Sequence, residues 1–343
     1  MRHGTTRTVS FSAPAVDGSV HRQTGLLHVP HAPAPRTGYP LVAYGHMTTG
    51  GGPRSAPSAG NPAHPEWRRM SQGDVLCDAL LARGVAVVRP DYEGIGGPGI
   101  HPYLVGSSLA ASVTSIVRAR EEFDAALGDD WVSAGHSEGA VAALWASVSD
   151  EPDGRSRLRG TAAFAPVTRL DLSIRWALRM PIAVPAFGVV SALIGLMLRG
   201  AAAVDARVGG LVRGDGLGAR ARALWPDLDA LCLTELAAPT SWGGLAPSSI
   251  ASPAGDELYD ALFEVFRRND VAALRGHRAP VRIDAARFDE VAPAPLTRRL
   301  LSGYRARGVD LTARWWPTHH SGTMRPRFAP SEAADWITAR FAE

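Results

Sequence analysis

The stretch WVSAGHSEGAV, residues 131–141, decides the fold of this 343-residue chain. It places the pattern G-x-S-x-G, centred on Ser137, after a short apolar β-type run and before a run of small residues with helical character. In a strand-to-helix turn of this kind the serine occupies a strained corner, so its neighbours must be small. Gly135 and Gly139 meet that requirement. The pattern therefore predicts a serine whose hydroxyl projects from the edge of a sheet.

Strands and helices alternate on both sides of this turn. Short apolar runs predict strands at residues 41–44, 85–88 and 160–164, and the strand pattern returns at residues 281–286 and 311–316. Helical spacing of apolar residues predicts helices around residues 75–80, 107–127 and 296–307, each with a glycine placed to end it. Two alternating runs joined by the polar turn Asp17-Gly18 predict an antiparallel hairpin at a sheet edge. The chain is thus predicted to be an α/β protein with a mostly parallel, doubly wound sheet.

A central segment departs from this alternation and divides the chain. Residues 168–276 contain helical stretches interrupted by proline and glycine, with no convincing strand. We therefore expect an α/β core formed by residues 1–167 and 277–343, with residues 168–276 inserted as a helical cap. The most apolar run of the cap, residues 182–198, is interrupted at Pro185 and bracketed by arginines. These features favour a buried or lipid-facing cap helix over a transmembrane helix.

The composition excludes some classes of function. The chain is 45% hydrophobic and 20% charged, with a formal net charge of +3, as in an ordinary soluble globular protein. It contains no lysine, and its many arginines occur beside many alanines and glycines, which indicates GC-rich coding rather than a basic patch. Nucleic-acid binding therefore gains no support.

The two cysteines and the N-terminal residues bear on metal binding and localisation. Cys77 and Cys232 are too few for a thiolate metal site, and no cofactor is expected. Buried free thiols are the simplest expectation, with one long-range disulfide as the alternative for an exported chain. Residues 1–14 have no apolar segment of the kind found in secretory signals. The sequence therefore predicts a cytoplasmic protein, or a secreted one if a leader has been removed.

Three loops that follow predicted strands carry the groups needed to activate a serine. A serine hydroxyl needs a base to remove its proton, and an imidazole base needs a carboxylate to hold its tautomer. Ser137 follows one strand, Asp289 follows another, and His319 and His320 follow the last. The order Ser, Asp, His is that of the α/β-hydrolase fold. This constellation predicts an α/β-hydrolase with a serine nucleophile.

Several longer motifs resemble one family of α/β-hydrolases. They are AYGHMTTG at residues 43–50, RPDYEGIGGPGIHPYL at 89–104, VRAR at 117–120, GHSEG at 135–139, FDEVAP at 288–293 and HHSGT at 319–323. On these motifs, most of the chain resembles the secretory lipase family, including its actinobacterial members. The resemblance implies a lipase or esterase with an inserted helical cap, with Ser137 as nucleophile, Asp289 as acid and a histidine of the last loop as base.

The chain also departs from the pattern of that family. Met47 stands where the resemblance leads us to expect a glycine in the oxyanion loop. A leader peptide and a dense set of disulfide cysteines are both missing from the printed sequence. Because of these departures, the resemblance does not decide whether the protein is exported or which substrate it uses.

The roles of single residues follow from their positions in the loops. We predict His320, not His319, as the base, because residues 320–323 resemble the histidine loop of that family, in which a small residue and a glycine follow the base and let the loop reach the serine. The expected oxyanion hole consists of the main-chain N–H groups of Glu138 and Thr48.

Other nearby groups have alternative interpretations. Asp91 and Glu93 are weaker candidates than Asp289 for the acid, since a proline before them and glycines after them indicate a structural turn. Asp284 lies within a strand and is expected to pair locally. His136 is expected to pack beside the turn rather than to act as a second base. His46, Tyr92 and Tyr103 are expected either to line an acyl pocket or to anchor loops.

These features lead to one main function and two alternatives. The main prediction is a cofactor-free serine ester hydrolase that cleaves small-molecule apolar acyl esters through an acyl-enzyme on Ser137, with a cap suited to transient contact with a lipid surface. The first alternative is an acyltransferase, thioesterase or cyclase of cytoplasmic biosynthesis that uses the same triad. The second is a binding protein of hydrolase fold without chemistry, which the complete triad argues against.

Overall fold

The computed structural model describes residues 1–179, 181–182, 188–253 and 255–342. The strands are β1 (Gly4–Pro14), β2 (Val20–Pro30), β3 (Tyr39–Gly45), β4 (Ala86–Pro90), β5 (Leu127–His136), β6 (Arg157–Phe164), β7 (Val281–Ala286) and β8 (Leu311–Trp316). The helices that pack around the sheet are α1 (Trp67–Met70), α2 (Asp74–Leu81), α3 (Gly106–Arg118), α4 (Arg120–Phe123), α5 (Glu138–Ala146), α13 (Ala294–Ala306) and α14 (Ala329–Ala339). Helices within residues 168–276 are α6 (Leu170–Ala177), α7 (Gly188–Val204), α8 (Ala206–Arg213), α9 (Ala219–Ala223), α10 (Asp227–Ala230), α11 (Leu233–Leu236) and α12 (Asp256–Asn269).

The strands of the described residues form one eight-stranded sheet in the order β1-β2-β4-β3-β5-β6-β7-β8. β1 and β2 form the predicted antiparallel hairpin, and β2 is also antiparallel to β4. From β4 through β3 to β8 every neighbouring pair is parallel. This mixed sheet with helices around it confirms the predicted α/β-hydrolase fold.

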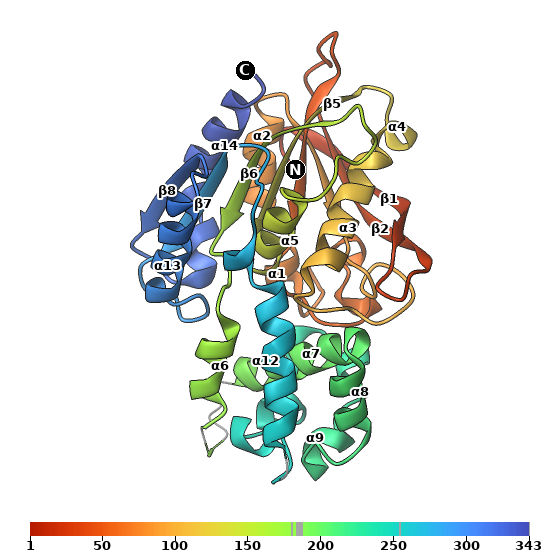
Figure 1. Ribbon diagram of the computed structural model, residues 1–343. Helices are drawn as coiled ribbons and strands as arrows, with labels where there is room; N and C mark the ends of the chain where they lie inside the picture. The colour runs from red at the N-terminus through yellow and green to blue at the C-terminus, as the bar shows by residue number, and fades with distance from the viewer. Residues whose placement is uncertain (180, 183–187, 254, 343) are drawn as a thin grey trace.

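Helices cover both faces of the sheet (Figure 1). Side chains alternate across β3, so that Leu41 and Ala43 join the apolar cluster under α3 and α5. Val42 and Tyr44 point to the other face, where the cluster includes residues of α2 and α14. Because both faces are buried, the central strands consist almost wholly of apolar residues, which is why their sequences are continuous apolar runs.

One predicted element is wrong in its extent. The spacing of apolar residues predicts a helix over 107–127 ended by Gly128, but α3 ends at Arg118, α4 is a separate short turn, and Gly128 lies inside β5. The side chain of Arg120 is buried and pairs with Asp129 and Asp153, while its Nε donates to the Gly128 carbonyl at 3.1 Å. A buried guanidinium needs such partners. The helix therefore ends before Arg120, where the chain turns and brings the side chain to these carboxylates.

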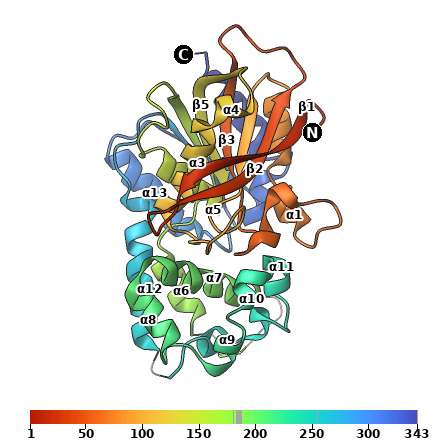
Figure 2. The ribbon, with the colours of Figure 1, turned by 90° about the vertical axis from the view of Figure 1, so that its right-hand side faces the viewer.

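The helices of residues 168–276, which we propose as the cap, lie together beyond the sheet (Figures 1 and 2). The chain enters them from the C-terminal end of β6 and returns into β7, so they face the edge where the parallel strands end. Contacts of α7 agree with this placement. A Cβ added to Gly51 would meet Leu196 at 2.9 Å, and Gly200 packs directly against the main chain of Tyr103.

The apolar run of the cap does not form a single membrane-length helix. Residues 183–187 of this run, including Pro185, lie outside the described residues, and residues 188–198 belong to α7. No individual helix in the described ranges is long and apolar enough to cross a membrane. Helices α7 and α8 together reach that length and composition, but they bend by 119° at their junction. Most residues in the middle of α7 are buried.

The two cysteines are free thiols. Cys77 lies in α2 against the sheet, and Cys232 precedes α11 in the cap, with both side chains buried. Burial raises the pKa of each thiol to about 12. The structure therefore confirms buried free thiols rather than a long-range disulfide, and both groups stay protonated and unreactive near neutral pH.

Candidate active site

Ser137 occupies a strained turn between β5 and α5. Its backbone has φ 59° and ψ −115°, a conformation that non-glycine residues rarely adopt, with a cost of about 1–3 kcal/mol. The N–H of Ser137 donates to the carbonyl of Phe164 on β6 at 2.9 Å, which helps to hold the turn. A Cβ added to Gly135 would collide with the main chain of Gly139, and one added to Gly139 would collide with the carbonyl of Gly45. Small neighbours are therefore required on steric grounds.

Gly139→Ala should consequently disrupt the turn. We expect the free energy of unfolding to fall by about 2 kcal/mol or more, because backbone atoms rather than a flexible side chain occupy the space. Urea denaturation would measure this loss. Gly210→Ala in α8 is the matched control, since nothing lies within 4 Å of its added Cβ, and it should raise stability by about 0.5–1 kcal/mol. Equal stability of Gly139→Ala and the wild type would contradict this account of the turn.

The structure brings Ser137, His320 and Asp289 together from three loops. Ser137 Oγ lies 2.8 Å from His320 Nε2, and His320 Nδ1 lies 2.9 Å from both carboxylate oxygens of Asp289. Because the carboxylate only accepts, Nδ1 carries the donated proton and Nε2 is free to accept from the serine hydroxyl. The main-chain N–H groups of Val291 and Ala292 donate to Asp289 Oδ1 at 2.9 and 2.6 Å. The carboxylate is therefore held in orientation toward the imidazole.

The two adjacent histidines have different surroundings. His320 begins a short 3-10 helix, η7 (His320–Met324), and is buried against Ser137. Its main-chain N–H donates to Glu290 Oε2 at 3.1 Å, a contact that the sequence pattern does not predict. The side chain of His319 is 46% exposed and lies 4.0 Å from the Glu290 carboxylate. The loop thus presents His320, and not His319, to the serine.

The other carboxylates considered for the acid are engaged elsewhere. Asp284 forms a buried ion pair with Arg282 at 2.7 and 2.9 Å. Asp91 accepts from a hydroxyl of the hairpin at 2.7 Å, and Glu93 accepts from a hydroxyl of α3 at 2.6 Å. Burial also raises the pKa of Asp91. Each of these groups therefore serves local structure.

His136 is a packed neighbour of the triad. Its ring centroid lies 5.0 Å from that of His320, and its Nε2 lies 3.3 Å from the His320 carbonyl oxygen. Burial, with a smaller contribution from His320, holds the pKa of His136 well below its ordinary value. The ring is therefore neutral near pH 7, and it packs against the loop that carries His320.

The two segments expected to form the oxyanion hole lie side by side. Glu138 is the first residue of α5, where an N–H has no acceptor within the helix. Its neighbour Gly139 packs against the carbonyls of Gly45 and His46, at the start of the loop that carries Thr48. Thr48 Oγ1 is hydrogen bonded to the Tyr103 hydroxyl at 2.8 Å.

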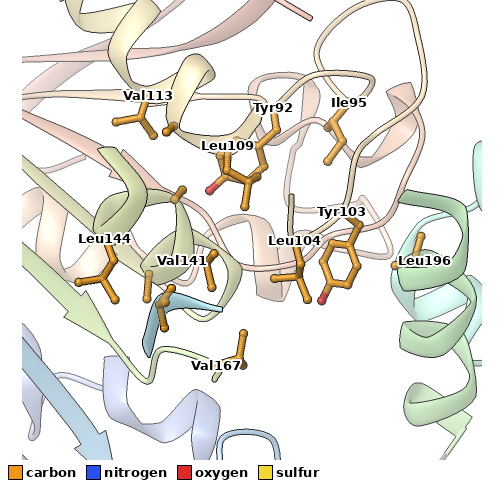
Figure 3. Close-up of a cluster of buried hydrophobic side chains, with 14 of the residues drawn as sticks. Tyr92, Ile95, Tyr103, Leu104, Leu109, Val113, Val141, Leu144, Val167 and Leu196 are labelled. Carbon is orange, nitrogen blue, oxygen red and sulfur yellow. The ribbon is translucent and has the colours of Figure 1, made fainter. Parts of the chain in front are cut away.

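The aromatic residues near this loop act mainly as anchors. The Tyr92 hydroxyl donates to the His46 carbonyl at 2.9 Å, and the two rings stack with centroids 4.3 Å apart. Both side chains are almost fully buried, so they fix the loop after β3 rather than line an open pocket. Tyr103 lies between Leu104 and Leu196 of α7 (Figure 3), and its hydroxyl is bonded to Thr48.

The reactive groups are covered, and an apolar surface lies beside them. Ser137 is only 6% exposed and His320 only 3%, so an ester needs some movement of the covering residues to reach them. A small cavity of about 20 Å³ is lined in part by Leu104, Val141 and Val167, which are labelled in Figure 3. No group of three or more His, Cys, Asp or Glu residues in the described ranges is arranged to hold a metal ion.

Comparison with known proteins extends these observations. A model of the secretory lipase family matches residues 69–174. The structure of Candida antarctica lipase A in its closed state is similar, with a TM-score of 0.74, 16% identity, and coverage of 92% of this chain and 73% of the lipase. The rice cell wall degrading esterase LipA from Xanthomonas oryzae gives a TM-score of 0.72 and 18% identity, covering 99% of this chain and 91% of the esterase. No curated protein sequence gives a significant match.

By its fold this protein is an α/β-hydrolase. The match of residues 69–174 to the secretory lipase model places it with the hydrolases of the lipase and esterase type, which act on esters. Within that class, the predicted resemblance to the secretory lipase family is confirmed by the family model, whose match includes the serine turn.

Proposed function

We propose that this protein is a cofactor-free serine hydrolase that cleaves apolar acyl esters through an acyl-enzyme on Ser137. The observation that carries the proposal is the continuous hydrogen-bond chain from Ser137 Oγ through His320 to Asp289, with distances of 2.8 and 2.9 Å. A neutral imidazole at this distance can take the serine proton, and the carboxylate steadies the imidazolium that results. Asp289 is the acid and His320 is the general base.

Acylation begins with attack of Ser137 Oγ on the ester carbonyl carbon. The serine proton passes to His320 Nε2, and the carbonyl oxygen becomes an oxyanion that faces the N–H groups of Glu138 and Thr48. When the tetrahedral intermediate collapses, the bond to the alcohol breaks and His320 returns the proton to the leaving oxygen. The acyl group remains esterified to Ser137.

Deacylation repeats the same sequence with water as the nucleophile. His320 takes a proton from water, the hydroxide attacks the acyl carbon, and Ser137 Oγ leaves with the proton that His320 returns. The products are a carboxylic acid and the free enzyme.

The cap is proposed to set the preferred acyl length. Val189 and Leu193 are half-buried on α7, the helix whose Leu196 lies against Gly51 in the loop that carries Thr48. Replacing Val189 or Leu193 with glutamine should change the profile of p-nitrophenyl ester chain lengths more than it changes stability. Val204→Gln at the 38%-exposed end of the same helix is the control and should leave the profile as it is. An unchanged profile for both inner variants would contradict this role of α7.

The proposal also includes where the enzyme acts: outside the cell and in transient contact with lipid. The matched family is described as secretory, which favours an exported enzyme over a cytoplasmic one. Ile182 of the cap is 62% exposed and Phe288, beside Asp289, is 71% exposed. Such large exposed apolar side chains suit transient contact with a lipid surface.

Product analysis tests the proposed reaction directly. The enzyme is incubated with a p-nitrophenyl ester in water, alone and with a competing alcohol, while a fluorophosphonate probe reports on the serine. We expect covalent labelling at Ser137 and free acid as the main product. Predominant transfer to the alcohol at millimolar concentration would identify an acyltransferase, and absence of labelling would refute the serine mechanism.

A further inference from the structure

A buried histidine and a buried glutamate form a hydrogen-bonded pair next to the serine turn. His101, from the loop between β4 and α3, places Nε2 2.8 Å from Oε1 of Glu138, the residue that follows Ser137. Its other ring nitrogen, Nδ1, lies 2.9 Å from the main-chain carbonyl oxygen of Glu93. The two side chains are 1% and 0% exposed. The proposed acyl-transfer steps make no use of either side chain.

The geometry determines how many protons the pair holds. A carbonyl oxygen can only accept, so Nδ1 of His101 must carry a proton. If Nε2 and the Glu138 carboxylate were both unprotonated, their lone pairs would face each other at 2.8 Å. A proton therefore lies between them, and the pair is neutral overall whether it is imidazolium with carboxylate or imidazole with carboxylic acid.

The side chains around the pair are neutral, so the shared proton alone sets the net charge at this place. Glu138 Oε2 has no hydrogen-bond partner among the described residues, and an uncompensated buried carboxylate is costly. The rings of Tyr92 and Tyr103 flank His101 at 5.9 Å, and burial together with Glu138 raises the pKa of both hydroxyls, so they stay neutral. Burial lowers the pKa of His46, beyond Tyr92, to about 3, so that ring is neutral as well.

We infer that His101 and Glu138 are a proton-sharing positioning pair for the oxyanion hole. The pair fixes the first residue of α5, whose N–H is the expected donor, and prevents the buried carboxylate from opposing the negative charge of the tetrahedral intermediate. Neither side chain needs to touch the ester. The inference rests on the proposed function, because it requires an oxyanion to form at Ser137.

Two substitutions separate charge from shape. In His101→Gln the amide can still donate to Glu138 but supplies no shared proton to balance the carboxylate, so kcat should fall by about thirtyfold with little change in KM. In Glu138→Gln the amide donates to a neutral His101 and no buried carboxylate is left, so kcat should fall much less than in His101→Gln. The double variant, which again has no net charge, should recover most of the kcat lost in His101→Gln.

A matched control and a spectroscopic measurement complete the test. His28→Gln replaces another buried histidine, hydrogen bonded to Thr6 at 2.8 Å in the hairpin, and should leave kcat unchanged. In NMR spectra of ¹⁵N-histidine-labelled protein, His101 should carry a downfield Nε2 proton that persists in Ser137→Ala and disappears in Glu138→Gln.

The possible outcomes distinguish this inference from the proposed function. Wild-type kcat in His101→Gln, or no recovery in the double variant, would overturn the positioning pair while an inactive Ser137→Ala still supported the serine mechanism. Hydrolysis by Ser137→Ala at the wild-type rate would instead overturn the proposed function.

Discussion

Ser137→Ala is expected to give a folded protein whose esterase activity is lower by a factor on the order of a thousand or more. The substitution removes the oxygen that lies 2.8 Å from His320 Nε2 and leaves the base without a nucleophile to activate. Initial rates with a p-nitrophenyl ester measure the loss, and intact-protein mass spectrometry after fluorophosphonate treatment should show no adduct. Thermal unfolding should show that the fold is intact.

The same strand offers a control for this change. Ser133 lies in β5, is fully buried, and its hydroxyl has no hydrogen-bond partner among the described residues. Ser133→Ala therefore makes an identical chemical change a few residues earlier and should keep wild-type activity and labelling. Retained turnover in Ser137→Ala would remove Ser137 from the mechanism.

His320→Ala is expected to have a comparably large effect, with kcat reduced by a factor on the order of a thousand or more. The variant lacks the base that accepts the serine proton and the acid that returns it to the leaving alcohol. Its KM should change little, because the imidazole is proposed to act on the reacting atoms rather than to bind the acyl chain. Steady-state kinetics with a short p-nitrophenyl ester would separate the two parameters.

His319→Ala is the neighbouring control. That side chain is 46% exposed and is placed 4.0 Å from Glu290, so its loss should cost far less than the loss of His320. If His319→Ala were the inactive variant and His320→Ala remained active, the base would have to be reassigned to His319.

Local sequence patterns predict much of this architecture. The predicted strands at residues 281–286 and 311–316 coincide with β7 and β8. β7 is buried along its whole length, whereas β8 is a partly buried strand at the edge of the sheet. Gly84 and Gly308 end their helices with φ of 75° and 72°, a conformation that favours glycine. The strained turn at Ser137 was likewise predictable, since the space around it admits only small residues.

Contacts between distant segments could not be predicted in the same way. The helix predicted over 107–127 ends early because Arg120 reaches Asp129 and Asp153, which are partners from other parts of the chain. The contact of Glu290 with the His320 main chain and the pairing of His101 with Glu138 are of the same kind. HPYL and GHSEG stand as separate motifs, and nothing in either indicates that a histidine of one meets a glutamate of the other.

The succession of strands and helices along the chain, the position of the serine turn and the loops that carry the candidate serine, acid and base are thus written in local residue patterns. Those patterns work because backbone sterics and side-chain periodicity act over a few residues. Packing decided which of two adjacent histidines faces Ser137, which carboxylate lies behind that histidine, and which histidine pairs with the buried Glu138. These choices depend on distances between groups far apart in the chain, such as the 2.8 Å between His320 and Ser137, and only the folded structure sets them.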